Sequence, residues 1–373
     1  MAQAMNPAKL RIALIGPLPP PSGGMANQTR QLAGLLAQEG VSVELVQVNA
    51  PYRPRWVSHI KGLRAVFRLL PYFFHLWRAA GHADLFHIMA NSGWSWHLYA
   101  APAIWIAKLR GRAVVVNYRG GEADEFFSRA FTLVKPSLNR VDVIIVPSGF
   151  LEQVFAKRGF ATCIVPNIVN LDRFSAGDAA RANQPHILVA RNLEPLYDNT
   201  SALRAFAIVR QQHPGARMTI AGTGPDRSAL EALALELGLT DAVTFAGRVE
   251  NSEMPTLYQT AHIALNPSLA DNMPISILEA LASGVPVVST DVGGVPFLVE
   301  DEKTALLVPP RDPERMAAAM LRVLHDQSLR ERLVQAGLEH ARRFAWENVR
   351  EKLFSAYAVA LGGSTWASTP EAR

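Results

Sequence analysis

Two acidic residues flank an expected helix start in the segment from residue 266 to 284. Asp271 precedes Pro274, and Glu279 follows it. Proline is favoured in the first turn of a helix, and the glycine that closes this apolar run is favoured at a helix end. The free N–H groups of the first turn, around residues 273–276, can bind an anion, and the two carboxylates can accept hydrogen bonds from sugar hydroxyl groups. In the alternative interpretation, Asp271 only caps the helix and Glu279 is solvated.

Glycines and one arginine follow other expected strands, where a phosphate group could bind. Gly23 and Gly24 come after the first strand and open a helix, and the lack of a Cβ atom lets the backbone approach a phosphate. Arg191 ends a strand in the second half of the chain, and its guanidinium suits bidentate binding of a diphosphate. Gly222 and Gly224 form a G-x-G turn, which is most often a plain strand-to-helix connection.

Parallel strands are needed to position these residues. Short β-branched runs alternate with helical spacing along the chain, as in parallel sheets that helices cover on both faces. Two such series predict an α/β protein with two doubly wound, Rossmann-like domains, whose ligands bind at the carboxyl ends of the strands. Strands are expected at residues 11–16, 42–48, 85–90, 113–117, 143–147 and 162–166, and again at 187–191, 218–222, 243–247, 263–267, 286–290 and 305–308.

Composition places the boundary between the two domains. The polar segment 175–185 lacks apolar periodicity and is expected to be a linker. The prediction is a first domain at residues 1–174, a second at residues 175–346, and a C-terminal helix and tail at residues 347–373 that return to the first domain. The carboxyl ends of the two sheets are expected to face one another across a cleft.

The composition favours a globular enzyme and excludes some kinds of site. Hydrophobic residues make up 49% of the 373 residues and charged residues 18%. Cys163 is the single cysteine, so neither an internal disulfide nor a cysteine-rich metal site is expected. The net charge of +5 divides into about +10 for residues 1–170 and about −5 for residues 171–373. The basic half is expected to meet an anionic partner, unless its lysines and arginines are simply solvated.

The segment 266–290 resembles the signature of retaining glycosyltransferases of family 4, which have the GT-B fold. In that family, two acidic residues separated by seven others precede an A-x-x-x-G-x-P-V-V motif. The resemblance implies that Glu279 binds the nucleotide ribose and that Asp271, in place of the usual glutamate, holds the transferred sugar. Residues after the acidic pair match the motif at Ala280, Gly284, Pro286, Val287 and Val288. The family also implies backbone contacts to the sugar from Asn272, Met273, Pro274 and Ile275.

The same resemblance implies roles for residues elsewhere in the chain. Family members pair an arginine like Arg191 with a lysine five or six positions later, but those positions are Leu196 and Tyr197 here. Arg191 and a helix dipole would therefore stabilise the leaving diphosphate without that lysine. Gly23 and Gly24 match the phosphate-side loop of the family.

Further positions match by their place after a strand. Gly222 and Gly224 lie in a turn that the family shares, and Arg248 and Val249 border its base pocket. Family members commonly show H-x-H where this chain has His87 followed by Met89, so His87 is a catalytic candidate, although a histidine in an apolar strand is more often a core residue. The acceptor-side or sugar-side candidates after the fourth strand are Arg119, Glu122 and Asp124.

The sequence predicts a glycosyl transfer that needs neither metal nor cofactor. No D-x-D pair, no H-E-x-x-H motif and no Walker loop is present. The expected donor is a UDP-, GDP- or ADP-sugar, and the expected acceptor is a saccharide or lipid-linked saccharide in cell-surface polysaccharide or glycolipid synthesis. Two alternatives stay open. One is a nucleotide-sugar epimerase of the same fold, and the other is a non-catalytic nucleotide-sugar-binding subunit, which the missing lysine and Met89 would suit.

Residues 52–78 combine basic and aromatic side chains. Such a segment can lie in a membrane interface, or its aromatic residues can pack on the sheet while its arginines stay in solvent. Nucleic acid is not an expected partner, because no recognition motif accompanies the charge. The N-terminus shows no secretory signal, and no apolar run approaches the length of a bilayer span. A cytoplasmic protein is therefore expected, with this segment as its peripheral contact with the inner face of the membrane.

Overall fold

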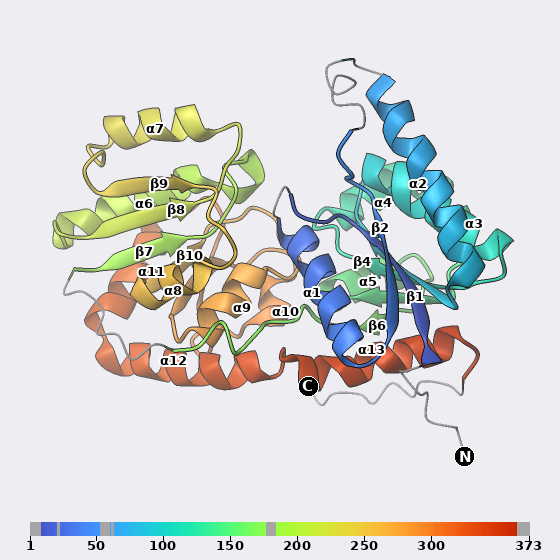
Figure 1. Ribbon diagram of the computed structural model, residues 1–373. Coiled ribbons are helices and arrows are strands. Elements are labelled where there is room, and N and C mark those ends of the chain that lie inside the picture. Colours follow the sequence, from blue (N-terminus) through green and yellow to red (C-terminus); the bar gives the residue numbers. More distant parts are fainter. Residues whose placement is uncertain (1–8, 21–22, 53–59, 61–62, 177–183, 364–373) are drawn as a thin grey trace. The chain divides into compact units, whose positions relative to one another are not determined.

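A computed structural model of the chain describes residues 9–20, 23–52, 60, 63–176 and 184–363 (Figure 1). Contacts divide the chain into two compact units. The first comprises residues Met1–Pro166 and Val349–Arg373, and the second comprises Asn167–Asn348.

The first unit is built on a parallel sheet of six strands in the order β2-β1-β3-β4-β5-β6. Its helices lie against both faces of the sheet (Figure 1). The strands are β1 (Arg11–Gly16), β2 (Ser42–Gln47), β3 (Leu85–Ala90), β4 (Ala113–Tyr118), β5 (Val143–Val146) and β6 (Cys163–Ile164). The helices are α1 (Gly24–Gln38), α2 (Leu63–His82), α3 (Ala101–Leu109) after a π-helical turn at Trp96–Ala100, α4 (Ala123–Leu138), α5 (Gly149–Ala156) and most of α13 (Trp346–Ala360).

The second unit repeats the scheme with the strand order β12-β11-β10-β7-β8-β9. The strands are β7 (His186–Val189), β8 (Arg217–Ala221), β9 (Val243–Gly247), β10 (Ile263–Asn266), β11 (Val287–Thr290) and β12 (Leu306–Val308). The helices are α6 (Asn199–Gln212), α7 (Arg227–Glu236), α8 (Met254–Thr260), α9 (Ile275–Ala282), α10 (Val295–Leu298), α11 (Pro313–His325) and α12 (Gln327–Arg342), with a 3₁₀ turn at Pro195–Tyr197.

The central strands explain why the chain folds in this way. Every residue of β3, β5, β10 and β11 is buried, so each strand has apolar neighbours on both faces. Parallel sheets covered by helices require such near-continuous apolar runs. The predicted strands all occur, with ends within a few residues of those expected, and the prediction of two doubly wound domains is confirmed.

The division between the units falls eight residues before the boundary expected at residue 174. Residues 167–174 belong to the second unit, because their hydrogen bonds lie there. The Asn167 side chain donates to the carbonyl oxygen of Met273 at 2.7 Å, and the backbone N–H of Val169 donates to Phe344 at 3.0 Å. The change of composition at residue 175 marks a loop, most of which lies outside the described residues.

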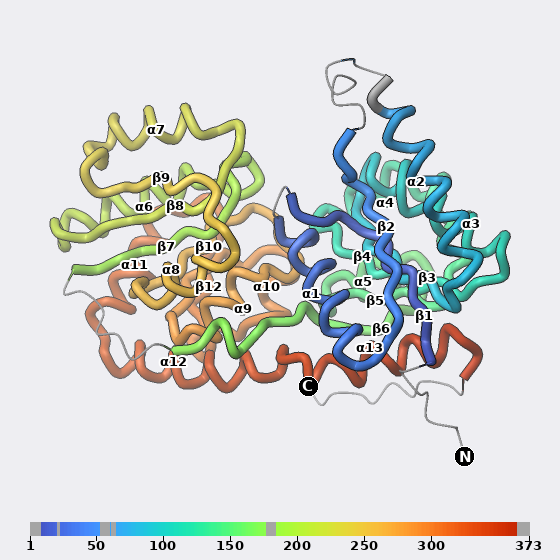
Figure 2. Tube along the Cα trace, in the orientation of Figure 1, coloured from blue at the N-terminus to red at the C-terminus, as the bar shows by residue number. Residues whose placement is uncertain are grey.

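Most of the last described helix, α13, lies in the first unit. Helix α13 packs beside the sheet of that unit (Figure 2). Tyr357 contacts His87 of β3, and Arg350 pairs with Glu39 at 3.2 Å. Within the described residues, no helix has the length and apolar character that crossing a bilayer requires.

Candidate active site

An ion pair stands at the carboxyl edge of the second sheet. Arg191 follows β7 and Asp271 follows β10, and these two strands are neighbours in parallel orientation. Neighbouring parallel strands end at the same edge, so the two side chains meet. The Nη2 atom of Arg191 lies 2.6 Å from Oδ2 of Asp271, and their side chains are only 11% and 14% exposed. The structure thus brings together the two charged residues that the sequence proposed for the diphosphate and the sugar.

Asn266 fixes the side chain of Arg191 by a hydrogen bond. Its Oδ1 atom accepts hydrogen bonds from Nε of Arg191 at 2.7 Å and from the hydroxyl of Ser268 at 2.8 Å. Its Nδ2 atom donates to Ser289 at 2.9 Å, so the orientation of the amide is fixed. The sequence interpretation missed Asn266 and Ser268. The signal was a polar residue at the end of an otherwise apolar strand.

A glycine pair fixes the backbone around Asp271. The N–H of Gly294 donates to the carbonyl oxygen of Asp271 at 2.9 Å. A Cβ atom on Gly293 would lie 2.2 Å from that same oxygen, and one on Gly294 would lie 1.9 Å from the carbonyl oxygen of Asn272. The N–H of Asn272 donates to Oδ1 of Asp271 at 2.9 Å. The loop after β11 therefore locks the acidic loop in place, and only glycine permits this approach.

Glu279 lies on α9 and is half-buried, and its carboxyl group has a partner within the second unit. The helix begins at Ile275, directly after Pro274, as the sequence predicted. The hydroxyl of Tyr258 donates to Oε2 of Glu279 at 3.1 Å. Burial raises the pKa of Glu279 to about 7, against the smaller opposing effects of the Tyr258 hydrogen bond and the nearby charges of Arg173 and Arg191. The carboxyl group is thus poised between its neutral and ionised forms near neutral pH.

The residues around the first turn of α9 are buried against the second unit. Asn272, Met273 and Pro274 are buried and Ile275 is half-buried. The Met273 side chain accepts a hydrogen bond from the N–H of Asn167 at 3.2 Å. The first-turn N–H groups of an α-helix have no partner within the helix, so anion binding at this helix start stays a prediction.

Gly222 and Gly224 face the backbone of the loop that carries Arg191. A Cβ atom on Gly222 would lie 2.0 Å from the carbonyl oxygen of Arg191, and one on Gly224 would lie 2.1 Å from that of Leu193. The N–H of Leu193 donates to Thr223 at 3.1 Å. These glycines therefore let two strand-end loops pack together, which positions Arg191.

The missing lysine has an aromatic replacement beside Arg191. The ring of Tyr197 lies 5.4 Å from the Arg191 guanidinium carbon, at a cation–π distance. The carbonyl oxygen of Leu196 accepts from the N–H of Leu269 at 2.8 Å, which ties this turn to the acidic loop.

Arg248 and Val249 follow β9. Arg248 pairs with an exposed carboxylate on Glu250 at 3.3 Å, and Val249 packs on the apolar cluster that includes Tyr258.

His87 lies in the core of the first unit, as the alternative interpretation of its apolar strand expected. Its side chain is fully buried, Nδ1 lies 2.8 Å from the hydroxyl of Tyr357, and Nε2 lies 3.1 Å from Nδ2 of Asn117. Burial, with a smaller effect of the Arg119 charge, lowers the pKa of His87 to about 3. Both ring nitrogens have partners within the first unit, so a substrate could reach the ring only if a neighbour moved.

Other candidates of the first unit are arranged around strand ends. Gly23 caps α1 and Gly24 begins it, and a Cβ atom on either would meet none of the described residues within 4 Å. Arg119 follows β4, and its Nε atom donates to Oδ1 of Asn117 at 3.1 Å. Glu122 precedes α4, whereas Asp124 pairs with Arg158 at 2.8 Å. Among the described residues, no group of three or more His, Cys, Asp or Glu side chains is placed to hold a metal ion.

The two units match two family profiles. Residues 22–173 match "Glycosyltransferase Family 4", and residues 172–340 match "Glycosyl transferases group 1". The profiles together cover most of both units. The chain therefore belongs to the group 1 glycosyl transferases of family 4, as the resemblance in its sequence predicted.

Curated relatives agree with this family. A D-inositol 3-phosphate glycosyltransferase of Acidothermus cellulolyticus is 35% identical over 223 residues, which are 55% of this chain and 50% of that protein. A second protein of that name, from Salinispora tropica, is 29% identical over 318 residues, or 76% of this chain and 65% of that protein. The matched part of the chain thus spans about half the length of the first relative and about two thirds of the second.

Solved structures confirm the GT-B fold with its two Rossmann-like domains. Sucrose-phosphate synthase from Thermosynechococcus elongatus superposes with a TM-score of 0.76 at 21% identity, over 94% of this chain and 98% of that one. Anabaena HepE in complex with UDP and glucose gives 0.74 at 16% identity, over 94% and 99%. At these identities the likeness concerns the fold alone.

The raised pKa of Glu279 predicts a pH-dependent loss of stability. The folded chain holds this proton more tightly than the unfolded chain between pH 4.5 and about 7, so stability falls as the pH rises through that window. We expect the Glu279→Gln variant to lack this loss, so that the wild-type chain becomes less stable relative to it by more than about 1 kcal/mol between pH 5 and 8. Chemical denaturation at several pH values measures this. The exposed control Glu339→Gln should follow the wild type, and parallel curves for wild type and Glu279→Gln would contradict the assignment.

Proposed function

We propose that this protein transfers a sugar from a nucleotide diphosphate to a saccharide or lipid-linked saccharide, with retention of configuration and without a metal ion. The observation that carries the proposal is the Arg191–Asp271 pair at the carboxyl edge of the second sheet, beside the start of α9. The membership in a glycosyltransferase family supports the reaction class. The cofactor-free chemistry follows from the proposal that protein groups neutralise the diphosphate.

The donor is proposed to bind the second unit. Arg191 binds the diphosphate together with the first-turn N–H groups of α9. A carboxylate has about four lone-pair positions. Asp271 forms an ion pair with Arg191 and accepts hydrogen bonds from the N–H of Asn272 at 2.9 Å and the hydroxyl of Ser268 at 3.5 Å, so positions remain for hydroxyl groups of the sugar. Glu279 accepts from the ribose, and Arg248 and Val249 contact the base. UDP and glucose in the HepE structure make UDP-glucose the first donor to test.

The transfer step needs no nucleophilic side chain. The bond between the sugar C1 and the diphosphate oxygen breaks ahead of attack. The acceptor hydroxyl oxygen bonds to C1 on the same face, and its proton passes to the departing phosphate. Arg191 and the helix start stabilise the growing negative charge. Within the first unit, the N–H groups at Gly23 and Gly24 are a separate candidate for binding a phosphate group. Arg119 and Glu122 are proposed to contact the acceptor.

A membrane contact is proposed on the outer face of α2. Tyr72 and Leu76 of this helix are buried in the core, whereas Leu70, Phe74 and Trp77 are 63%, 66% and 50% exposed. The helix therefore carries one apolar stripe toward the sheet and a second one outward. The inward stripe fits the interpretation that the aromatic residues pack on the sheet, and the outward stripe fits the interpretation of a membrane interface. Residues 53–59 and 61–62 lie outside the described residues.

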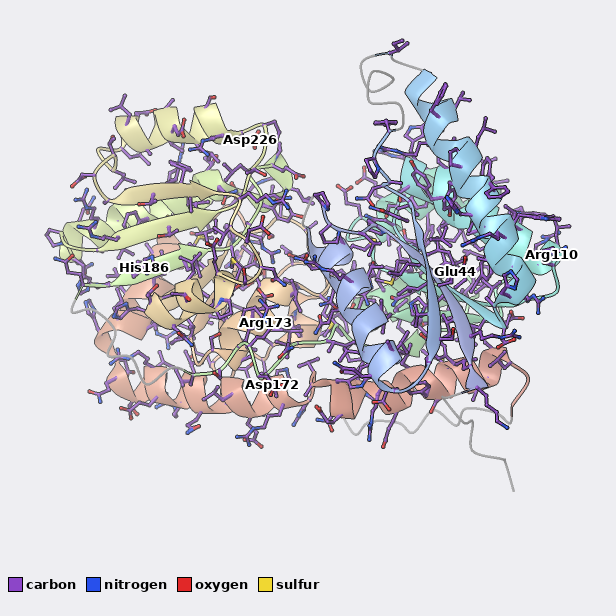
Figure 3. All side chains as sticks on the ribbon, viewed as in Figure 1. Glu44, Arg110, Asp172, Arg173, His186 and Asp226 are labelled. Carbon is purple, nitrogen blue, oxygen red and sulfur yellow. The ribbon has the colours of Figure 1, made fainter. Side chains whose placement is uncertain are left out.

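The charge around this stripe favours an anionic bilayer as the partner. The guanidinium of Arg110 lies 4.7 Å from the ring of Trp77, and Figure 3 shows Arg110 beside α2. Arg78 is exposed and pairs with Glu44. Between residues 51 and 121 the sequence contains a single acidic residue, Asp84, which pairs with Arg11. Exposed aromatic side chains with flanking cations suit a lipid interface. A cytoplasmic enzyme of polysaccharide or glycolipid synthesis would meet a lipid-linked acceptor there.

Donor binding and turnover test the proposed reaction. We expect Glu279→Ala to weaken UDP-glucose binding by about tenfold or more, because the ribose loses a carboxyl group that accepts its hydrogen bonds. The control Glu339→Ala should bind as the wild type does, and calorimetry measures both.

Turnover with membrane-extracted or synthetic saccharide acceptors should continue in EDTA. A strict metal requirement would contradict the mechanism. Isomerised donor without acceptor would favour an epimerase, and tight binding without turnover would favour a binding subunit.

Vesicle sedimentation tests the membrane contact. We expect the chain to bind phosphatidylglycerol vesicles more tightly than phosphatidylcholine vesicles, and less tightly as salt rises. The double variant Leu70→Ser/Phe74→Ser should lose most of the binding, whereas the control Leu235→Ser, at another exposed leucine, should keep it. Equal binding to both lipids, or binding unaffected by the double variant, would contradict the proposal.

A further inference from the structure

We propose that Tyr357, His87 and Asn117 act as positioning residues that hold Arg119 through a chain of hydrogen bonds with one fixed direction of donation. The inference rests on the proposed function in one respect, since Arg119 is there assigned to the acceptor. The chain runs from α13 through β3 and β4 to the carboxyl edge of the first sheet. The three positioning side chains are buried.

The contacts are continuous and involve segments far apart in the sequence. Tyr357 lies 2.8 Å from Nδ1 of His87, although 270 positions separate the two residues. Nε2 of His87 lies 3.1 Å from Nδ2 of Asn117, and Oδ1 of Asn117 lies 3.1 Å from Nε of Arg119. The register of the sheet supports this order, because β3 and β4 are paired neighbours with His87 opposite Val115. The C-terminal helix thereby reaches Arg119 through two buried side chains.

The guanidinium sets the direction of the whole chain. A guanidinium only donates hydrogen bonds, so the group of Asn117 that faces Arg119 is the carbonyl oxygen. The amide nitrogen of Asn117 then faces His87 and donates to Nε2. The Nε2 atom of His87 accepts this bond, so it must be unprotonated. The proton of the neutral ring therefore resides on Nδ1 and is donated to the hydroxyl oxygen of Tyr357. One tautomer of His87 satisfies all three contacts.

The surroundings of the ring agree with this assignment. Tyr357 and Arg119 are the titratable groups whose contacts or charge act on His87. Protonation of Nε2 would place two donors against each other at Asn117, and the neighbouring cation opposes a second positive charge. Burial and that cation lower the pKa of the ring to about 3. The imidazole is therefore a neutral relay whose two nitrogens have different, fixed roles.

The consequence for function is the placement of Arg119. Its Nε atom is held by Asn117, and its backbone N–H donates to the carbonyl oxygen of Ala90 at 2.9 Å. Gly120, the next residue, packs against the loop after β3, where a Cβ atom would lie 2.3 Å from the hydroxyl oxygen of Ser92. Backbone and side chain are both fixed, so loss of the relay should alter the direction of the guanidinium and leave the strand in place.

Nuclear magnetic resonance of the full chain tests the direction of the relay. Histidine labelled with 15N gives different long-range couplings for the two tautomers, and His87→Gln identifies the signal. We expect a neutral ring protonated at Nδ1 from pH 5 to 8. A ring protonated at Nε2, or an imidazolium in this range, would overturn the proposal. This measurement needs no substrate, so its result does not depend on turnover.

Two variants test the relay further. Asn117→Asp replaces the donor with an acceptor, so His87 should become protonated at Nε2 and titrate at a higher pH. Tyr357→Phe removes the acceptor of the Nδ1 proton. We expect it to lower kcat/KM for the acceptor by about tenfold, with unchanged UDP-glucose affinity. The control Tyr72→Phe removes another buried hydroxyl of the first unit, which donates to Tyr99, and should leave kcat/KM unchanged.

The outcomes separate this proposal from the proposed function. The expected tautomer without any turnover would count against the glycosyl transfer and leave the relay standing. Turnover with the wrong tautomer, or equal losses in Tyr357→Phe and Tyr72→Phe, would overturn the relay and leave the transfer standing.

Discussion

The second unit depends on keeping a guanidinium and a carboxylate together with little access to water. Removing either charge from water is costly, and a partly buried pair is tolerated only when further hydrogen bonds complete it. Asn266 and the N–H of Asn272 supply those bonds to Arg191 and Asp271. The loops that carry the pair must therefore approach closely. This explains the glycines at positions 222, 224, 293 and 294, where a Cβ atom would collide with a carbonyl oxygen.

Burial also shifts the pKa of one residue in each unit, in opposite directions. At Glu279 burial raises the pKa toward neutrality, because one hydroxyl donor and the charges of Arg173 and Arg191 offset the loss of water only in part. At His87 it lowers the pKa, because the ring gains neutral partners on both sides. Glu279 can therefore change its protonation state near neutral pH, whereas His87 stays neutral. Desolvation thus suits the first residue to ligand binding and the second to holding its neighbours in place.

Apolar periodicity was sufficient to predict the strands and the α/β class, and with them that functional side chains gather at the carboxyl ends of the strands. The ion pair between Arg191 and Asp271 was not predicted. Polar partners were harder to predict. Asn266 stood at the end of an apolar strand, and nothing local revealed that it faces Arg191. The partner of His87 lies 270 positions away, so its burial between Asn117 and Tyr357 could not be inferred from the neighbouring residues. The boundary near residue 166 likewise depends on long-range contacts such as Asn167 with Met273.

The central claim is that Arg191 and Asp271 act on the donor as one unit. A double-mutant cycle with Arg191→Lys, Asp271→Asn and the combined variant measures this directly, with UDP-glucose affinity read by calorimetry. If the pair forms the donor site, each single variant weakens binding and the combined variant loses less than the sum, with a coupling of at least about 1 kcal/mol. Additive losses, or unchanged affinity in either single variant, would contradict the account.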